Sequence, residues 1–168
     1  MKILVPVDSS KAALAPIAHL AALHRAGIEI EALVLNVQPR FPRHLAQFTS
    51  RAARQDLRAE RSREAMARAI EDLSAGGVPF RAMTEVGVPA ERIAAVAERE
   101  KVDEIMMGVG RHPAWLRWVN PSIAQGVMAR TDIGVTVFAR GEVGVLQRYA
   151  VPAGVAGLAA LLLTAEQP

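Results

Sequence analysis

The stretch KILVPVDSSKAALAPIAHLAALHRAG, residues 2–27, contains the unit from which the fold of this chain is built. Residues 2–7 form a short apolar run of strand length, and a helical apolar pattern follows it. Ser9 and Ser10 are candidate N-caps for that helix, and Gly27 is its stop signal. The stretch therefore predicts a strand followed directly by a helix.

The same alternation continues along the chain. Further strands are predicted at residues 28–37, 78–87, 102–110 and 133–138, and further helices at residues 50–75, 89–100 and 120–131. Five strands that alternate with four helices predict an α/β fold with a parallel sheet covered by helices on both faces, because parallel neighbours need crossover connections. In the long helix we expect one apolar side, formed by Ala52, Ala59, Met66, Ile70 and Leu73.

The composition is typical of a globular protein, with 51% apolar residues among 168. The absence of cysteine excludes disulfide frameworks, cysteine-ligated metals and cysteine nucleophiles. The net charge of +3 is too small to indicate a nucleic-acid-binding protein. The apolar run at the N-terminus is too short for a signal peptide, so we expect a cytoplasmic protein.

Four segments of the chain together resemble the universal stress protein family. They are KILVPVDSS at the start, LVLNV at the end of the second strand, EVGVPAERIAAVAEREKVDEIMMG in the middle and IGVTVF in the last strand. The resemblance covers residues 1–139 and implies a five-stranded, Rossmann-like α/β sandwich. It also implies a homodimer, and the binding of ATP or AMP by some members but not by others.

The family's phosphate-binding motif is altered in GVGRHPAWLRWVNPS, residues 108–122. That motif has a glycine, two residues, a second glycine, nine residues, a third glycine and then Ser or Thr. Counted from Gly108, the second glycine falls on Arg111, the third on Pro121 and the hydroxyl on Ser122. Arg111 brings a side chain into space that phosphate would occupy and Pro121 removes one N–H donor, although Arg111 could itself bind a phosphate.

The resemblance carries the family's binding residues over to positions at the ends of the strands. The acid after the first strand matches Asp8, and the residue that meets the base through its main chain matches Val37. Adenosine contacts are implied for one half of the site and phosphate contacts for the other. The complete candidate set is Pro6, Val7, Asp8, Val37, Met107, Gly108, Gly110, Arg111, Ser122 and Ile123.

Structural roles are alternatives for several of these residues. The Asp8 carboxylate could accept hydrogen bonds from the first turn of the following helix, and the Ser122 hydroxyl could bond locally. Trp115 and Trp118 are more typical of an apolar turn over the core or at a partner surface than of base-stacking platforms. No catalytic residue is predicted, because hydrolase-elbow and Walker A motifs are both absent.

Other polar residues do not indicate a further ligand. The arginines at 51, 54, 58 and 61 share one helical face, but Asp56, Glu60 and Glu64 are interleaved with them. This pattern is typical of an ion-paired surface rather than a nucleic-acid interface. The four histidines show no metal-ligand spacing, so we expect no metal site.

The chain divides into an α/β domain, residues 1–140, and an apolar C-terminal extension, residues 141–168. Residues 149–165 carry no charge, a length of 17 at the lower edge of the ~17–25 residues that span a membrane. A helix there could instead bury Val155, Leu158, Leu161 and Leu162 against the domain or a second subunit, which we favour over membrane contact.

Two functions therefore remain open from the sequence. The first is a stress-response protein that binds ATP or AMP without turnover, at a site whose phosphate loop is altered. The second is a nucleotide-independent dimeric scaffold that meets a protein partner through the Trp115 and Trp118 loop and the C-terminal extension.

Overall fold

Five strands and the helices that connect them make up the described part of the chain. The computed structural model describes residues 1–40, 50–109 and 123–139. The strands are β1 (Lys2–Pro6), β2 (Glu31–Gln38), β3 (Phe80–Val86), β4 (Glu104–Val109) and β5 (Gly134–Ala139). The helices are the short 3₁₀ helix η1 (Lys11–Ala13), α1 (Leu14–Arg25), α3 (Arg51–Ala75), α4 (Pro89–Glu100) and α5 (Ile123–Met128).

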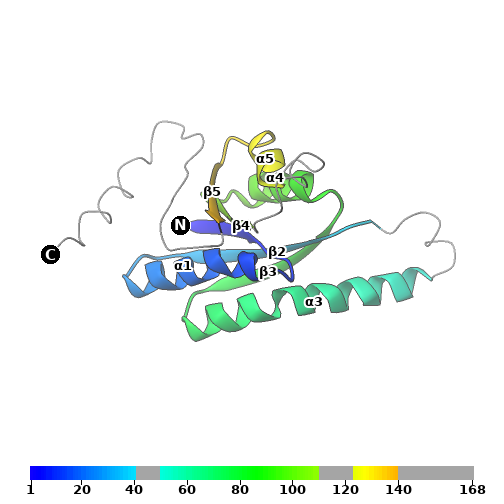
Figure 1. Ribbon diagram of the computed structural model, residues 1–168, viewed down its shortest axis with the longest axis horizontal. Coiled ribbons are helices and arrows are strands. Elements are labelled where there is room, and N and C mark those ends of the chain that lie inside the picture. The colour runs from blue at the N-terminus through cyan, green and yellow to red at the C-terminus, as the bar shows by residue number, and fades with distance from the viewer. Residues whose placement is uncertain (41–49, 110–122, 140–168) are drawn as a thin grey trace.

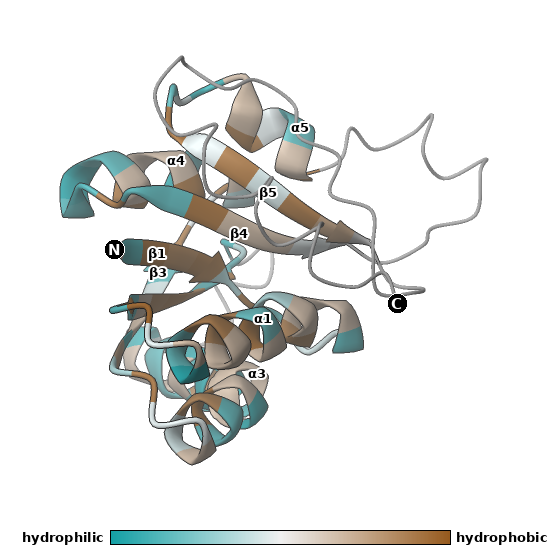
Figure 2. Cartoon of the chain, turned by 90° about the vertical axis from the view of Figure 1, so that its left-hand side faces the viewer, coloured by the Kyte–Doolittle hydropathy of each residue, from teal (hydrophilic) through white to brown (hydrophobic). Residues whose placement is uncertain are grey.

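All strand pairs in the sheet are parallel, and their order is β3-β2-β1-β4-β5. The order reverses at β1, because chain neighbours run outward on one side to β3 and on the other side to β5. Figure 2 shows α1 and α3 on one face of the sheet and α4 and α5 on the other. The predicted five-stranded parallel sheet with helices on both faces is confirmed.

Successive residues of each strand supply two separate cores. On β1, Ile3 and Val5 pack under α1 and α3, whereas Leu4 packs under α4 and α5. β4 divides in the same way, with Met106 in the first core and Met107 in the second. Strands buried on both faces read as continuous apolar runs, which is why residues 2–7 show no polar alternation.

The predicted apolar side of α3 is wrong in its first half. Ala52 and Ala59 are exposed, and burial begins only at Ser62 and continues through Met66, Ala69 and Leu73. α3 has 25 residues, and its first half extends beyond the ends of the strands (Figure 1). A helical pattern cannot show where the supporting sheet stops.

The first helix also begins differently from the prediction. Ser10 has the N-cap position of η1 but makes no side-chain cap bond, and α1 starts only at Leu14. Gly27 follows the helix with a φ of 85°, a left-handed conformation that suits its predicted role as a stop. Among the described helices, none combines the length and the apolar character needed to cross a membrane.

Candidate functional site

The candidate site lies at the carboxyl edge of the sheet, where β1, β2, β3 and β4 end at Pro6, Gln38, Val86 and Val109. In open parallel sheets, ligands bind outside this edge at the point where the strand order reverses. Here that point lies between β1 and β4. It brings Asp8, which follows β1, to the same edge as Gly108, which is in β4.

The end of β1 is fixed to β2 by a buried amide. Asn36 is 3% exposed, and its Nδ2 donates to the carbonyl of Val7 at 2.8 Å. Its Oδ1 accepts from Nε2 of Gln38 at 2.6 Å, and the Val7 N–H donates to the carbonyl of Leu35 at 2.8 Å. Asn36 was not among the predicted site residues, although one amide in the apolar run LVLNV was a signal for a buried polar role.

Asp8 stands exposed next to this fixed strand end. Its Oδ1 accepts a hydrogen bond from the N–H of Ser10 at 2.9 Å, so the predicted local bond to the following helical turn is present. The carboxylate stays accessible to solvent while it holds this turn. The same residue can therefore order the β1–η1 connection and present an anionic acceptor at the carboxyl edge.

Gly108 is required by packing against η1. A Cβ at this position would lie 1.9 Å from the carbonyl oxygen of Ala12 and 2.9 Å from the nitrogen of Ala13. The backbone of η1 therefore lies directly on β4, and only glycine leaves room for it. This close approach places the turn that Asp8 orders beside the end of β4.

The remaining predicted residues divide between the described and undescribed parts of the chain. Val7 and Met107 are buried, Pro6 and Val37 are half-buried, and Ile123 is 48% exposed at the start of α5. Met107 and Val37 face the core under α4 and α5, so only their main chains face the site from the strand ends. Gly110, Arg111, Ser122 and the two tryptophans lie outside the described residues.

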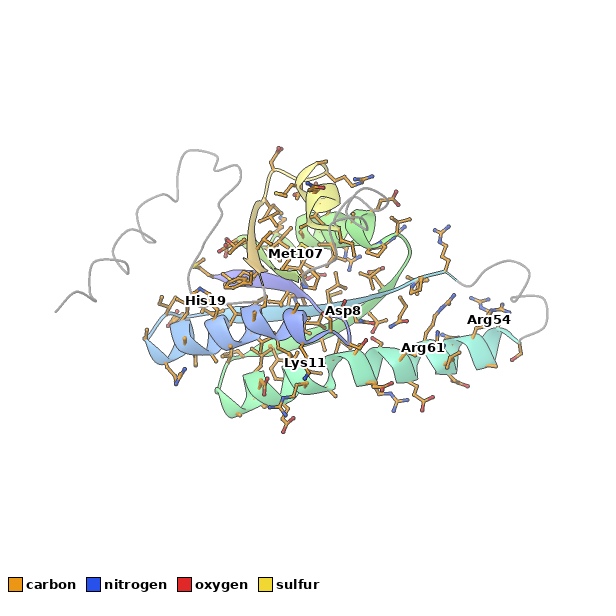
Figure 3. All side chains as sticks on the ribbon, viewed as in Figure 1. Asp8, Lys11, His19, Arg54, Arg61 and Met107 are labelled. Carbon is orange, nitrogen blue, oxygen red and sulfur yellow. The ribbon has the colours of Figure 1, made fainter. Side chains whose placement is uncertain are left out.

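Cations lie around the carboxyl edge. Figure 3 shows Lys11 close to Asp8 at the start of the first helix, and Arg54 and Arg61 on the half of α3 that extends beyond the sheet. Lys11 and Arg61 are exposed.

The opposite edge of the sheet has a structural ion-pair cluster. Glu100 accepts from Nη2 of Arg81 at 2.9 Å, and its carboxylate also lies 3.5 Å from Nζ of Lys2 and 3.5 Å from Nε of Arg99. The hydrogen bond from Arg81 lowers the pKa of the Glu100 carboxyl, and Arg99 and Lys2 act in the same direction. A shallow depression at this edge, lined by Lys2, Glu29 and Glu31 among others, is far from the switch in strand order.

His19, on α1, is half-buried and packs against β5. Its ring centroid is 5.2 Å from that of Phe138, and burial lowers the pKa of its imidazole against the opposite effect of Glu104. Within residues 1–40, 50–109 and 123–139 no group of three His, Asp or Glu side chains could hold a metal ion. The contact between His19 and Phe138 is therefore a packing contact between α1 and β5.

Comparisons with known proteins agree with this fold. The profile of the universal stress protein family matches residues 1–139. The structure is similar to that of the hypothetical protein MJ0577, with 25% sequence identity and a TM-score of 0.67 over 84% of this chain and 97% of that chain. No curated protein matches the chain.

Two further solved structures share the fold at lower identity. One is a universal stress protein in complex with cAMP, with 17% identity and a TM-score of 0.61 over 82% of this chain and 96% of that one. The other is a universal stress protein family member from Arabidopsis thaliana with AMP bound, with 16% identity and a TM-score of 0.53 over 84% and 92% of the two chains.

Proposed function

The chain belongs to the universal stress protein family, and we propose that it acts in the stress response by binding an adenine nucleotide, ATP or AMP, at the carboxyl edge of its sheet. The observation that supports this proposal is that an exposed carboxylate lies next to a strand end that a buried hydrogen bond holds in place. Asn36 holds the end of β1, and Asp8 presents its carboxylate beside it at the switch in strand order. Two proteins of the same fold are described with cAMP or AMP bound.

The described residues are suited to the adenosine part of the ligand. A carboxylate accepts hydrogen bonds from the paired hydroxyls of a ribose, and it does so best when its own position is already fixed. Asp8 meets this condition through its bond to Ser10. The main chain at Val37 supplies polar groups for a base, since β2 ends one residue later at Gln38.

The phosphate contacts of Gly110, Arg111, Ser122 and Ile123 stay a prediction from the sequence. Without the second and third glycines, fewer backbone N–H groups can approach a phosphate. We therefore propose tighter binding of the nucleoside part than of a triphosphate chain, and a response through binding rather than turnover.

We also propose that the protein forms a homodimer in which β5 of each subunit lies at the interface. β5 is an edge strand without a charged residue, and Val137 and Phe138 are half-buried. The other edge strand, β3, has Arg81 and Glu85 in ion pairs, a pattern that discourages edge-to-edge pairing. The scaffold alternative depends on Trp115, Trp118 and the extension, which lie outside the described residues, and it stays a prediction.

Calorimetric titration of adenosine, AMP and ATP tests the nucleotide proposal, with Asp8→Asn as the variant and Asp132→Asn as the control. Asparagine keeps an Oδ1 acceptor for Ser10 but loses the carboxylate charge, so we expect AMP affinity to fall about tenfold or more. Asp132 is exposed before β5 at the opposite edge, and its substitution should leave affinity unchanged. Absence of any heat at millimolar nucleotide would refute the proposal.

A further inference from the structure

Arg92, in the first turns of α4, has a guanidinium that pairs with none of the described residues. Its Nε is buried and makes no hydrogen bond, and none of the ion pairs formed within residues 1–40, 50–109 and 123–139 includes this side chain. Buried polar atoms in folded proteins are nearly always hydrogen-bonded, because an unpaired one costs free energy. Since Arg92 is only half-buried and no described residue pairs with it, its charge is open to an acceptor from outside the chain.

The turn between β3 and α4 is shaped around the Arg92 side chain. A Cβ on Gly87 would lie 2.8 Å from Nε and 3.0 Å from Cγ of Arg92, so the side chain lies across the bare Cα of the glycine. The Gly87 N–H donates to the carbonyl of Gln38 at 3.0 Å, which joins the turn to the end of β2. The guanidinium is thus held at the carboxyl edge, beside the last residues of β2 and β3.

No ion pair joins Arg92 to an acidic residue of β3 or α4. Glu85 on β3 is bound by Arg99, whose Nη1 lies 3.0 Å from Oε1 of the glutamate. Arg99 is seven residues after Arg92 and so lies on the same side of α4, two turns further along. Glu91, next to Arg92 in sequence, is exposed. Of two arginines on one side of the same helix, one is paired and the other leaves its charge available.

We propose that Arg92 is an oxyanion-binding residue of the carboxyl edge, and that its ligand is the phosphate or carboxylate group of a small molecule. A guanidinium binds such groups through two parallel charge-assisted hydrogen bonds. The start of α4 adds positive potential on the same side, since the N-cap residue Val88 makes no side-chain cap bond. The proposed function supplies a nucleotide phosphate as the candidate ligand, and the inference rests on it for the ligand's identity alone.

Nuclear magnetic resonance of the arginine Nε–Hε groups tests this site directly. The Arg92 signal is assigned by its loss in Arg92→Lys, with Arg92→Gln as a second assignment variant. Inorganic phosphate, acetate, AMP and adenosine are titrated into the full chain. We expect phosphate and AMP to shift the Arg92 signal to saturation, and adenosine to leave it in place. The Arg99 signal is the control in the same spectrum, because its side chain is already bound by Glu85.

The affinities give a second readout. In the unmodified chain, AMP should bind more tightly than adenosine. Arg92→Gln should weaken AMP binding about tenfold or more, the change expected from loss of a charge-assisted hydrogen bond, and should leave adenosine binding unchanged. A shift with acetate but not with phosphate would assign the site to carboxylates instead of phosphates.

The same spectra distinguish a failure of the oxyanion site from a failure of the nucleotide proposal. An Arg92 signal that stays in place with phosphate, acetate and AMP overturns the oxyanion site, even where the backbone amides of Asp8 and Val37 shift with adenosine. If those amides do not respond to adenosine or AMP while phosphate shifts the Arg92 signal, the nucleotide proposal fails and the oxyanion site stands.

Discussion

Substitution of Gly108 by alanine tests the closest backbone approach at the carboxyl edge. The new Cβ would lie 1.9 Å from the carbonyl oxygen of Ala12 and 2.4 Å from its carbonyl carbon. Since Cβ atoms essentially never approach other heavy atoms within 3.0 Å, η1 has to move away from β4 by at least about 1.1 Å. The atoms in the way belong to backbone, so no side-chain rotation relieves the contact.

The expected cost follows from the kind of contact. Overpacking in a well-packed region costs about 1–3 kcal/mol, and a displaced backbone puts Gly108→Ala in the upper half of that range. Replacing glycine by alanine in a strand also stabilises the protein by about 0.5–1 kcal/mol, because the unfolded chain has less conformational entropy to lose on folding. We expect a net loss of about 2 kcal/mol, which lowers the midpoint of thermal unfolding by roughly 4–8 °C for a chain of this size.

Gly134→Ala is the matched control, in the neighbouring strand β5. A Cβ on Gly134 meets no atom within 4 Å. Thermal and urea unfolding of both variants, followed by circular dichroism without nucleotide, gives the comparison. If Gly108→Ala is as stable as Gly134→Ala, then η1 does not lie on β4 as described, and the need for glycine at position 108 must come from a ligand.

Two further predictions concern the polar groups that hold the sheet together. Glu100→Gln should lower the free energy of unfolding at neutral pH. The folded-state pKa of Glu100 is below its usual 4.5, so its ion pairs stabilise the fold above that value, and this stabilisation is lost as the pH falls through the folded-state pKa. Urea midpoints of variant and parent measured from pH 7 to pH 3 should therefore converge, and a gap that persists at low pH would contradict the ion-pair explanation. Asn36→Ala should cost about 1–3 kcal/mol in urea unfolding, because the carbonyl of Val7 loses a buried donor. It should also weaken AMP binding, whereas unchanged affinity would show that the end of β1 does not need this amide.

Much of the fold follows from local patterns. Residues 89–100 form the predicted helix at the predicted bounds, because Pro89 at its start and the apolar spacing within it act over a few residues. The predicted strands all form, although β2 starts at Glu31 rather than at residue 28. The first half of α3 shows the limit, since the exposure of Ala52 and Ala59 depends on where the sheet ends.

The candidate site could be predicted only in part. The sequence placed Asp8 and Gly108 at strand ends, and the parallel sheet brings those ends to one edge. It did not reveal that Asn36 bonds to Val7, 29 residues away, because the register of two strands decides which carbonyl the amide reaches. It did not reveal either that Arg92 lies across Gly87 with no partner among the described residues, because that depends on how the turn after β3 folds back against α4.

The sequence by itself determined the order of strands and helices and the family to which the chain belongs, since periodicity and short motifs are properties of neighbouring residues. Only the tertiary structure decided that Gly108 has to be glycine for η1 to lie on it, and that α3 extends past its sheet. It also decided that Arg92 lies across Gly87 with no partner in the part of the chain that the structure describes. These facts depend on which surfaces meet and how closely. Close packing of segments far apart in the chain fixes them, and no local pattern encodes that.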